Sequence, residues 1–263
     1  MPLDLTPLLK LALIPLSILV ASLVSRRFGH GVGGVISGMP MIAGPIVAVL
    51  LIDQPPATVA AIARATLASA PATVGFMVVF ARFADRMPWT GCLAVSVAAF
   101  LAIGWGLSGL GAPAAVVAAI GLASPPVAMA LMPRVRHLAG PVSVPRGEIL
   151  MRMTAGVVVG GLILYGATHL PPRINGLLLA WPITGSILPC FTLPRYGRDA
   201  TVALLRGFLN GLIGFMVFFV AITLLLEAGT RAPLAFVAAF SAAGLSAWTV
   251  YRFRVARARV PAP

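Results

Sequence analysis

Acidic side chains are scarce in this sequence and are absent from its apolar interior. Of the 263 residues only 10% are charged, with six acids against nineteen basic residues. The acids lie at the ends of the apolar stretches or between them: Asp4, Asp53, Asp85, Glu148, Asp199 and Glu227. Coupling through a carboxylate buried in a membrane, which is usual for antiporters of cations, is therefore not expected.

The residues of metal sites and hydrolytic enzymes are also few. Cys92 and Cys190 both lie inside apolar stretches, so neither a disulfide framework nor a zinc site is supported. His30, His137 and His169 lie at the ends of such stretches. The sequence holds no HExxH, no CxxC and no Ser-His-Asp order, so we expect no enzymatic activity and no cofactor.

Apolar runs dominate what is present. Hydrophobic residues make up 60% of the chain, and the mean hydropathy is +1.03. Nine runs are long enough to cross a bilayer, at residues 5–24, 31–52, 57–80, 88–110, 113–132, 148–169, 174–193, 200–226 and 232–251. The pattern predicts an all-α polytopic membrane protein of about nine transmembrane helices, with the lipid bilayer as its first partner.

Basic residues between the runs predict the orientation. One face receives thirteen: Arg26, Arg27, Arg82, Arg86, Arg134, Arg136, Arg146, Arg195, Arg198, Arg252, Arg254, Arg257 and Arg259. The other face receives only Arg173 and Arg231. The net charge of +13 is therefore interpreted as a topology signal and not as nucleic-acid binding. A bacterial inner-membrane protein with a periplasmic N-terminus and a cytoplasmic C-terminus is expected.

The two halves of the sequence repeat each other at an offset of 142 residues. ATVAAIAR at 57–64 returns as ATVALLR at 200–206, and GFMVVF at 75–80 returns as GFMVFF at 214–219. Lys10 and Arg64, both inside apolar runs, correspond to Arg152 and Arg206. The second copy is three residues shorter between the arginine and the GFMV motif.

This repeat predicts the domain organisation. Residues 1–112 form a first four-helix repeat, 113–147 a connecting fifth helix with its loop, 148–251 a second repeat, and 252–263 a basic cytoplasmic tail. Because the connecting helix crosses the membrane, the second repeat is inserted with inverted topology. If the connecting helix did not cross the membrane, the two repeats would be parallel. The basic loop residues would then no longer gather on one face of the membrane.

Helices 2 and 7 of this arrangement are expected to be broken. Gly31–Ile52 and Asn175–Leu193 are apolar but rich in glycine and proline, and Gly34 and Pro40 return as Gly176 and Pro182. Broken helices are tolerated in a bilayer only where protein or a water-filled cavity satisfies the freed backbone groups. Paired interruptions of this kind mark the binding site of many transporters.

The architecture resembles the inverted-repeat secondary transporters, in which interrupted helices from two halves meet near the bilayer midplane. The run from Gly38 through Pro40 to Gly44 and Pro45 also resembles motifs of bacterial membrane proteins whose function is uncharacterised. What the resemblance implies is a substrate site at the two breaks. The predicted site residues are Gly38, Pro40, Gly44, Pro45, Trp181, Pro182, Thr184, Gly185, Ser186 and Pro189, with Arg64, Arg206 and Asn210.

Each of these signals has a simpler structural interpretation. Glycine and proline are common in membrane helices, where small residues permit close packing. Arg64 and Arg206 lie about 10 Å inside their runs, at 1.5 Å per residue, and a side chain can snorkel from that depth. The functional interpretation of these arginines is different, because basic residues without buried acidic partners favour a negatively charged cargo.

Two functional hypotheses therefore remain. The first is a secondary transporter that moves a small organic anion or an amphipathic anionic metabolite by alternating access. The alternative is a non-transporting scaffold or lipid-binding subunit, whose basic tail binds anionic lipid or a protein. A cavity at Pro40 and Pro182 would favour the transporter, whereas tight helix packing there would favour the scaffold. Both allow a homo-oligomer.

Overall fold

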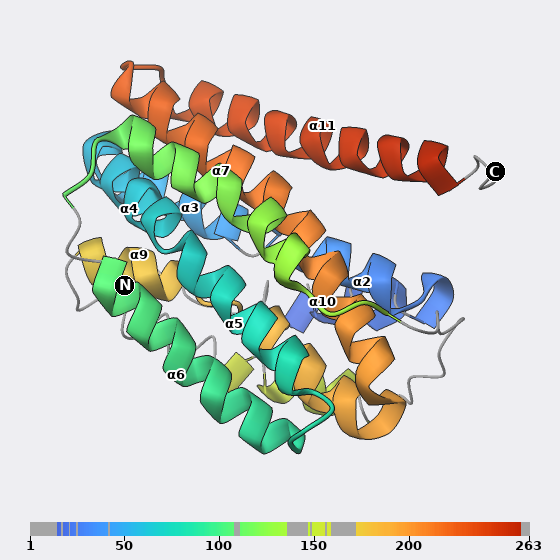
Figure 1. The fold of residues 1–263 in the computed structure, drawn as a ribbon. Helices are drawn as coiled ribbons and strands as arrows, with labels where there is room; N and C mark the ends of the chain where they lie inside the picture. The colour runs from blue at the N-terminus through green and yellow to red at the C-terminus, as the bar shows by residue number, and fades with distance from the viewer. Residues whose placement is uncertain are drawn as a thin grey trace, which may run out of the picture.

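The computed structural model describes residues 15–16, 18–20, 22–24, 26–41, 43–107, 111–135, 147, 149–155, 157–158 and 172–258. These residues form helices and no strands. The helices are α2 (His30–Gly38), α3 (Ala43–Asp53), α4 (Pro56–Ala68), α5 (Ala70–Phe83), α6 (Trp89–Leu107), α7 (Ala114–Leu131), α9 (Pro172–Leu179), α10 (Ile183–Glu227) and α11 (Ala232–Ala258). Figure 1 shows them as one bundle of roughly aligned helices, with α6 and α11 on opposite sides.

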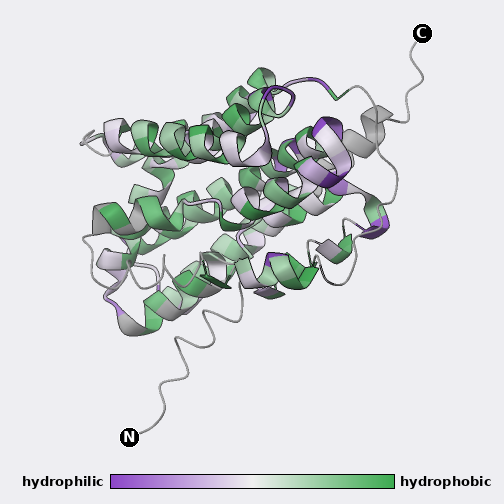
Figure 2. Cartoon of the chain, turned by 90° about the horizontal axis from the view of Figure 1, so that it is seen from below, coloured by the Kyte–Doolittle hydropathy of each residue, from purple (hydrophilic) through white to green (hydrophobic). Residues whose placement is uncertain are grey.

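Several described stretches are long and apolar enough to cross a membrane. They are Pro56–Phe83, Trp89–Leu107, Ala114–Leu131 and Leu177–Glu227, and Ala232–Ala247 is a shorter apolar stretch. Figure 2 shows apolar residues along the lengths of the helices, with hydrophilic residues mainly in turns and at helix ends. The expected runs 5–24 and 148–169 fall largely outside the described residues. The fold is thus an all-helical bundle suited to a membrane.

Long α10 contains two limbs. Gly197 has φ 75° and ψ −174°, which is not helical, so the chain turns there between the expected seventh and eighth runs. A positive φ is a conformation that glycine adopts without a Cβ clash. Residues 183–196 form the first limb and residues 198–227 the second limb.

Contacts sort the helix ends into two opposite ends of the bundle. At the end we call the basic end, Arg82 at the end of α5 donates to the carbonyl of Leu131 at the end of α7 (2.9 Å). Arg198, after the Gly197 turn, lies 3.6 Å from Asp85. At the opposite end, the last turn of α3 lies beside the first turn of α11, where Ile52 and Pro233 line one cavity.

The first repeat has a break that the sequence pattern alone did not predict. The expected run 57–80 is divided into α4 and α5 at Ser69, and Pro71 lies in the first turn of α5. Proline cannot donate the amide hydrogen bond that would continue the helix. The corresponding segment of the second copy, the second limb of α10, is three residues shorter and is a continuous helix. The three additional residues of the first copy therefore accommodate the break.

Glycines bring α2 into direct contact with the second limb of α10. A Cβ added at Gly34 or Gly38 would collide with the backbone of Leu204 or Phe208. In return, a Cβ at Gly207 or Gly211 would collide with the backbone of α2. Small residues allow such close backbone approach between membrane helices. We call these four glycines the glycine crossing, and it fixes the first interrupted helix against the second half of the chain.

Candidate functional site

Both interruptions lie where the glycine and proline pattern predicts them. Helix α2 ends at Gly38 and α3 begins at Ala43, while α9 ends at Leu179 and α10 begins at Ile183. Pro40 and Pro182 lie inside the two gaps, and both are buried. The prediction that regular helix lapses near residues 39–45 and 181–186 is thus confirmed at the start of each range.

The two interruptions share one hydrogen-bond pattern at the 142-residue offset. In the first, the amide of Met39 donates to Ile36, that of Met41 to Met39, and that of Gly44 to Pro40 (3.2, 2.7 and 2.8 Å). In the second, Trp181 donates to Leu178, Ile183 to Trp181, and Ser186 to Pro182 (3.1, 2.9 and 2.7 Å). The sequence repeat therefore extends to the local backbone structure.

The interrupted helices run antiparallel. The ring of His30, at the start of α2, lies 5.0 Å from that of Tyr196, at the end of the first limb of α10. Near the other end of this pair, the Thr184 hydroxyl donates to the carbonyl of Ser37 (3.1 Å). The first break is thereby brought beside the start of α10.

Each interruption is capped by a threonine from the other half. Thr184 supplies a hydrogen bond to a carbonyl at the end of α2, as just described. Thr73 of α5 donates to the carbonyl of Ala180, between α9 and α10 (2.7 Å). Carbonyls at a helix end lack intrahelical partners, and burying them unpaired is costly. These two hydroxyls, which we call the crossed caps, join the broken helices to the opposite half.

Sequence reasoning missed Thr73. A threonine in an apolar helix usually returns its hydroxyl to the carbonyl four residues earlier. Thr66 and Thr223 do so, with bonds of 2.9 and 2.7 Å to Ile62 and Phe219. Nothing local distinguishes Thr73 from them, so its capping role became visible only in three dimensions.

Trp181 occupies the second interruption. Its ring packs edge-on against Phe76 of α5 and Phe100 of α6, with centroids 5.8 and 4.8 Å away. Its indole Nε1 is buried without a hydrogen-bond partner among the described residues. Indole N–H groups usually find a partner when buried. The second interruption thus contains a buried indole N–H that has no partner in the described part of the chain.

Three of the predicted residues lie together near Phe208: Gly38, Thr184 and Gly185. A Cβ at Gly185 would meet Phe208 and Met77, and a Cβ at Gly38 would meet the Phe208 backbone. Thr184, whose hydroxyl bonds to Ser37, is buried at 4% exposure, and Asn210 is buried in the second limb of α10 at 6% exposure. Ser186 and Pro189 follow, buried in the first limb of α10. The structure therefore gathers Gly38, Thr184 and Gly185 at the junction of the two interrupted helices.

Other predicted residues lie elsewhere. Gly44 in α3 faces α11, since a Cβ there would meet the ring of Phe240. Pro45 follows it in α3. Arg64 and Arg206 each lie eight residues into a helix, counted from Pro56 and from Arg198. At 1.5 Å per residue this places both about 12 Å from their helix starts.

Arg64 has an acidic partner that the sequence did not predict, although this partner lies at the end of its run and is not buried. Its guanidinium lies 3.5 Å from the carboxylate of Glu227, and the two side chains are 46% and 37% exposed. Glu227 is at the end of its apolar run as expected, but α4 passes beside that end. An arginine already paired contributes less positive potential to a negatively charged cargo.

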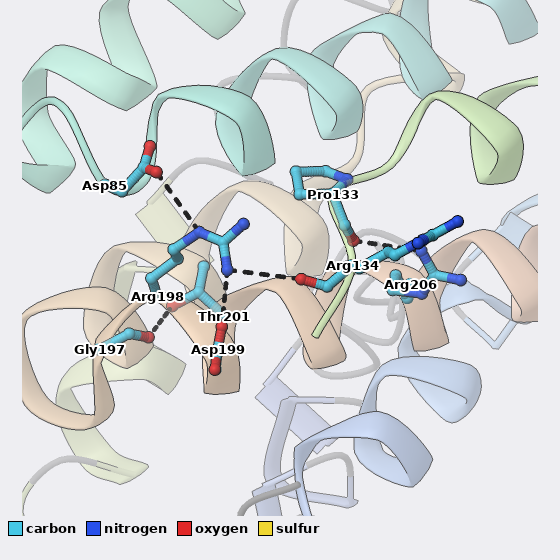
Figure 3. A network of polar contacts seen from close by, with 8 residues as sticks. All are labelled: Asp85, Pro133, Arg134, Gly197, Arg198, Asp199, Thr201 and Arg206. Atoms are coloured by element: carbon cyan, nitrogen blue, oxygen red, sulfur yellow. Dashed lines mark hydrogen bonds and ion pairs between the residues drawn. The ribbon is translucent and has the colours of Figure 1, made fainter. Parts of the chain in front are cut away.

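Arg206 has no carboxylate partner in the described part of the chain. Its Nη1 donates to the carbonyl of Pro133, just beyond α7, at 3.2 Å. Figure 3 shows it beside Arg134, whose own carbonyl accepts from Arg198 (3.5 Å). Carbonyl oxygens beyond the end of α7 thus bind two arginines of the second half.

One cavity among the described residues lies away from the interruptions. About 250 Å³ lies between α3 and α11, lined by Ala48, Leu51, Ile52, Ala232, Pro233 and Phe236. Every one of these residues is apolar, so this cavity offers a place for hydrocarbon and not for an ion. Where the chain is described, no three His, Cys, Asp or Glu residues cluster as metal ligands.

Comparisons with known proteins add no relative. No protein-family model matches the chain, and neither a curated protein nor a solved structure matches it significantly.

Proposed function

We propose that this chain is an inner-membrane secondary transporter built from two halves of inverted topology. The observation that carries the proposal is the pair of interruptions, which share one hydrogen-bond pattern, run antiparallel and are capped crosswise by Thr73 and Thr184. Paired interrupted helices are where transporters of this architecture bind substrate, and alternating access moves one half against the other. Sequence repeat and backbone repeat support the same two-fold relation.

The substrate site of this proposal is the junction of the interrupted helices. Thr184 and Ser186 supply polar groups at the start of α10, and the Trp181 indole adds a donor without a partner in the described structure; the predicted Asn210 is buried in the second limb of α10. The junction is buried, as it is in a state closed to both faces. Opening it requires the crossed caps to separate, because they join the two halves at this point.

The proposed cargo is a small organic anion. Among the described residues Arg206, about 12 Å inside its helix, has no acidic partner, whereas Arg64 shares its charge with Glu227. Such an asymmetric distribution makes the basic end the more attractive one for a negative group. The basic end is the cytoplasmic one under the positive-inside rule.

Thermal stabilisation of the purified protein tests this function. A ligand that binds only the folded state raises the apparent stability, by about 2.7 kcal/mol at one hundred times its Kd. A panel of organic anions, matched with cations of similar size, should contain anions that raise the unfolding temperature. Arg206→Gln should weaken that shift, and Arg231→Gln, an exposed arginine at the opposite end, should not. Stabilisation by cations alone would contradict an anionic cargo.

The orientation has its own test. A reporter fused after Pro263 should lie in the cytoplasm, and one fused before Met1 should lie in the periplasm, because thirteen basic loop residues fall on one face. Activity of both fusions on the same side would contradict nine crossings and with them the inverted repeat.

The glycine crossing favours a second candidate function, a non-transporting scaffold. Backbone contact between α2 and α10 is the tight packing that such a structural role requires. In this case the junction never opens to water. Solvent access at Ser186 therefore separates the two functions.

A further inference from the structure

Two ion pairs join the first half of the chain to the second. Arg64 of α4 pairs with Glu227 at 3.5 Å, and Asp85, just after α5, pairs with Arg198 at 3.6 Å. In each case one partner lies before residue 112 and the other after residue 148, so both pairs cross the boundary between the proposed halves. Each acid lies near the C-terminal end of a helix that carries a GFMV motif: Asp85 is two residues beyond α5, and Glu227 is the last residue of α10.

The pairs lie at opposite ends of one helix. Arg198 is the first residue of the second limb of α10 and Glu227 is the last. A helix of this length separates them by about 43 Å at 1.5 Å per residue. The second limb of α10 is therefore held against α4 at one end and against the end of α5 at the other. If it rocks between these contacts, one end separates while the other stays closed.

Both pairs are exposed enough to break easily. The side chains of Arg64 and Glu227 are 46% and 37% exposed, and those of Arg198 and Asp85 are 22% and 52% exposed. Where water and salt reach such pairs, each biases an equilibrium by about fivefold at most. A contact of this strength can hold an end closed and still open within a transport cycle.

We propose that Arg64–Glu227 and Asp85–Arg198 are the two gates of the protein, and that they open one at a time. This inference rests on the proposed transport function. The structure, in which both pairs are formed, is a state closed at both ends. Arg206 lies eight residues further along α10 than Arg198, on the inner side of the cytoplasmic gate. An anion would meet it after Asp85 and Arg198 separate.

Cysteine accessibility in lipid nanodiscs tests the gates without a known substrate. Cys92 and Cys190 are first replaced with serine, and a reporter cysteine is placed at Ala60 near one pair or at Ala81 near the other. Both alanines are buried, at 4% and 1% exposure. Glu227→Gln should raise maleimide labelling about fivefold at Ala60→Cys only, and Asp85→Asn should do so at Ala81→Cys only.

Matched controls remove an exposed charge without breaking a pair. Arg231→Gln at the first end and Arg86→Gln at the basic end should leave labelling unchanged. The reversed pair, Arg64→Glu with Glu227→Arg, should restore the slow labelling of the parent protein. This rescue separates the loss of a gate from a loss of folding.

Each remaining outcome is decisive. If both reporters label measurably in every variant at the rates of the controls, the ends open but the ion pairs are not the gates. If neither reporter labels in any variant, including Glu227→Gln combined with Asp85→Asn, the ends do not open and the proposed transport function is itself contradicted. If one substitution opens both ends together, the gates do not alternate.

Discussion

Alanine at Gly207 and Gly211 together is expected to lower the unfolding temperature in detergent by several degrees. The two added methyl groups would enter the backbone of α2 at Gly31 and Val35. Since backbone cannot move aside as a side-chain end does, α2 must separate from α10. Overpacking of this kind costs about 1–3 kcal/mol for each site, and 1 kcal/mol corresponds to about 2–4 °C in a protein of this size.

Exposed helical glycines provide the control for this prediction. An added Cβ at Gly106 or Gly244 would meet nothing within 4 Å. Alanine has the higher helix propensity by about 1 kcal/mol, so Gly106→Ala and Gly244→Ala should be neutral or stabilising. Equal effects at the crossing and at these positions would show that α2 and α10 are not in backbone contact.

Removing the crossed caps should have the second large effect. Valine replaces the threonine hydroxyl with a methyl group of similar shape, so Thr73→Val leaves the buried Ala180 carbonyl without its donor, and Thr184→Val removes the donor to the half-buried Ser37 carbonyl. An unsatisfied buried acceptor costs about 1–3 kcal/mol. The loss of stability should be measurable by thermal unfolding for each single variant.

A matched pair of valine variants shows whether capping is the cause. The hydroxyls of Thr66 and Thr223 bond to carbonyls of their own helices, which keep their backbone partners. Thr66→Val and Thr223→Val should therefore cost clearly less than the cap variants. Should all four substitutions cost the same, the crossed caps have no special part in holding the interruptions.

The interruptions could be predicted from sequence because their causes are local. Pro40 and Pro182 lack an amide donor, and each makes a continuous helix costly wherever the residue lies. Their recurrence at a fixed offset reinforced the prediction, and the backbone pattern around Met39 and Trp181 repeats in the same way. The break at Ser69 was harder to predict, because the three additional residues of the first copy could also have lengthened a helix.

Pairing between distant residues could not be predicted in this way. The approach of α4 to the end of α10 decides that Arg64 reaches Glu227, and neither run contains that information alone. The same holds for Thr73, whose partner is 107 residues away. Close helix contacts were also not predictable, because a glycine in an apolar run fits either a helix break or a close contact. Gly38 has both roles: it ends α2, and it lies against Gly211 of α10.

The central claim is that the junction of the interrupted helices opens to each face of the membrane in turn. Ser186 is a suitable reporter, because its side chain is only 5% exposed and should react only when the junction opens. Its hydroxyl bonds to Ile183 of the same helix, so a cysteine at this position breaks no contact between helices. The reporter Ser186→Cys, in a chain whose native cysteines are serine, is treated with a membrane-impermeant maleimide in vesicles of known orientation. Ala239→Cys, fully buried in α11, is the control that should react from neither face. The account predicts that Ser186→Cys reacts from both faces; reaction from one face only, or from neither, would contradict it.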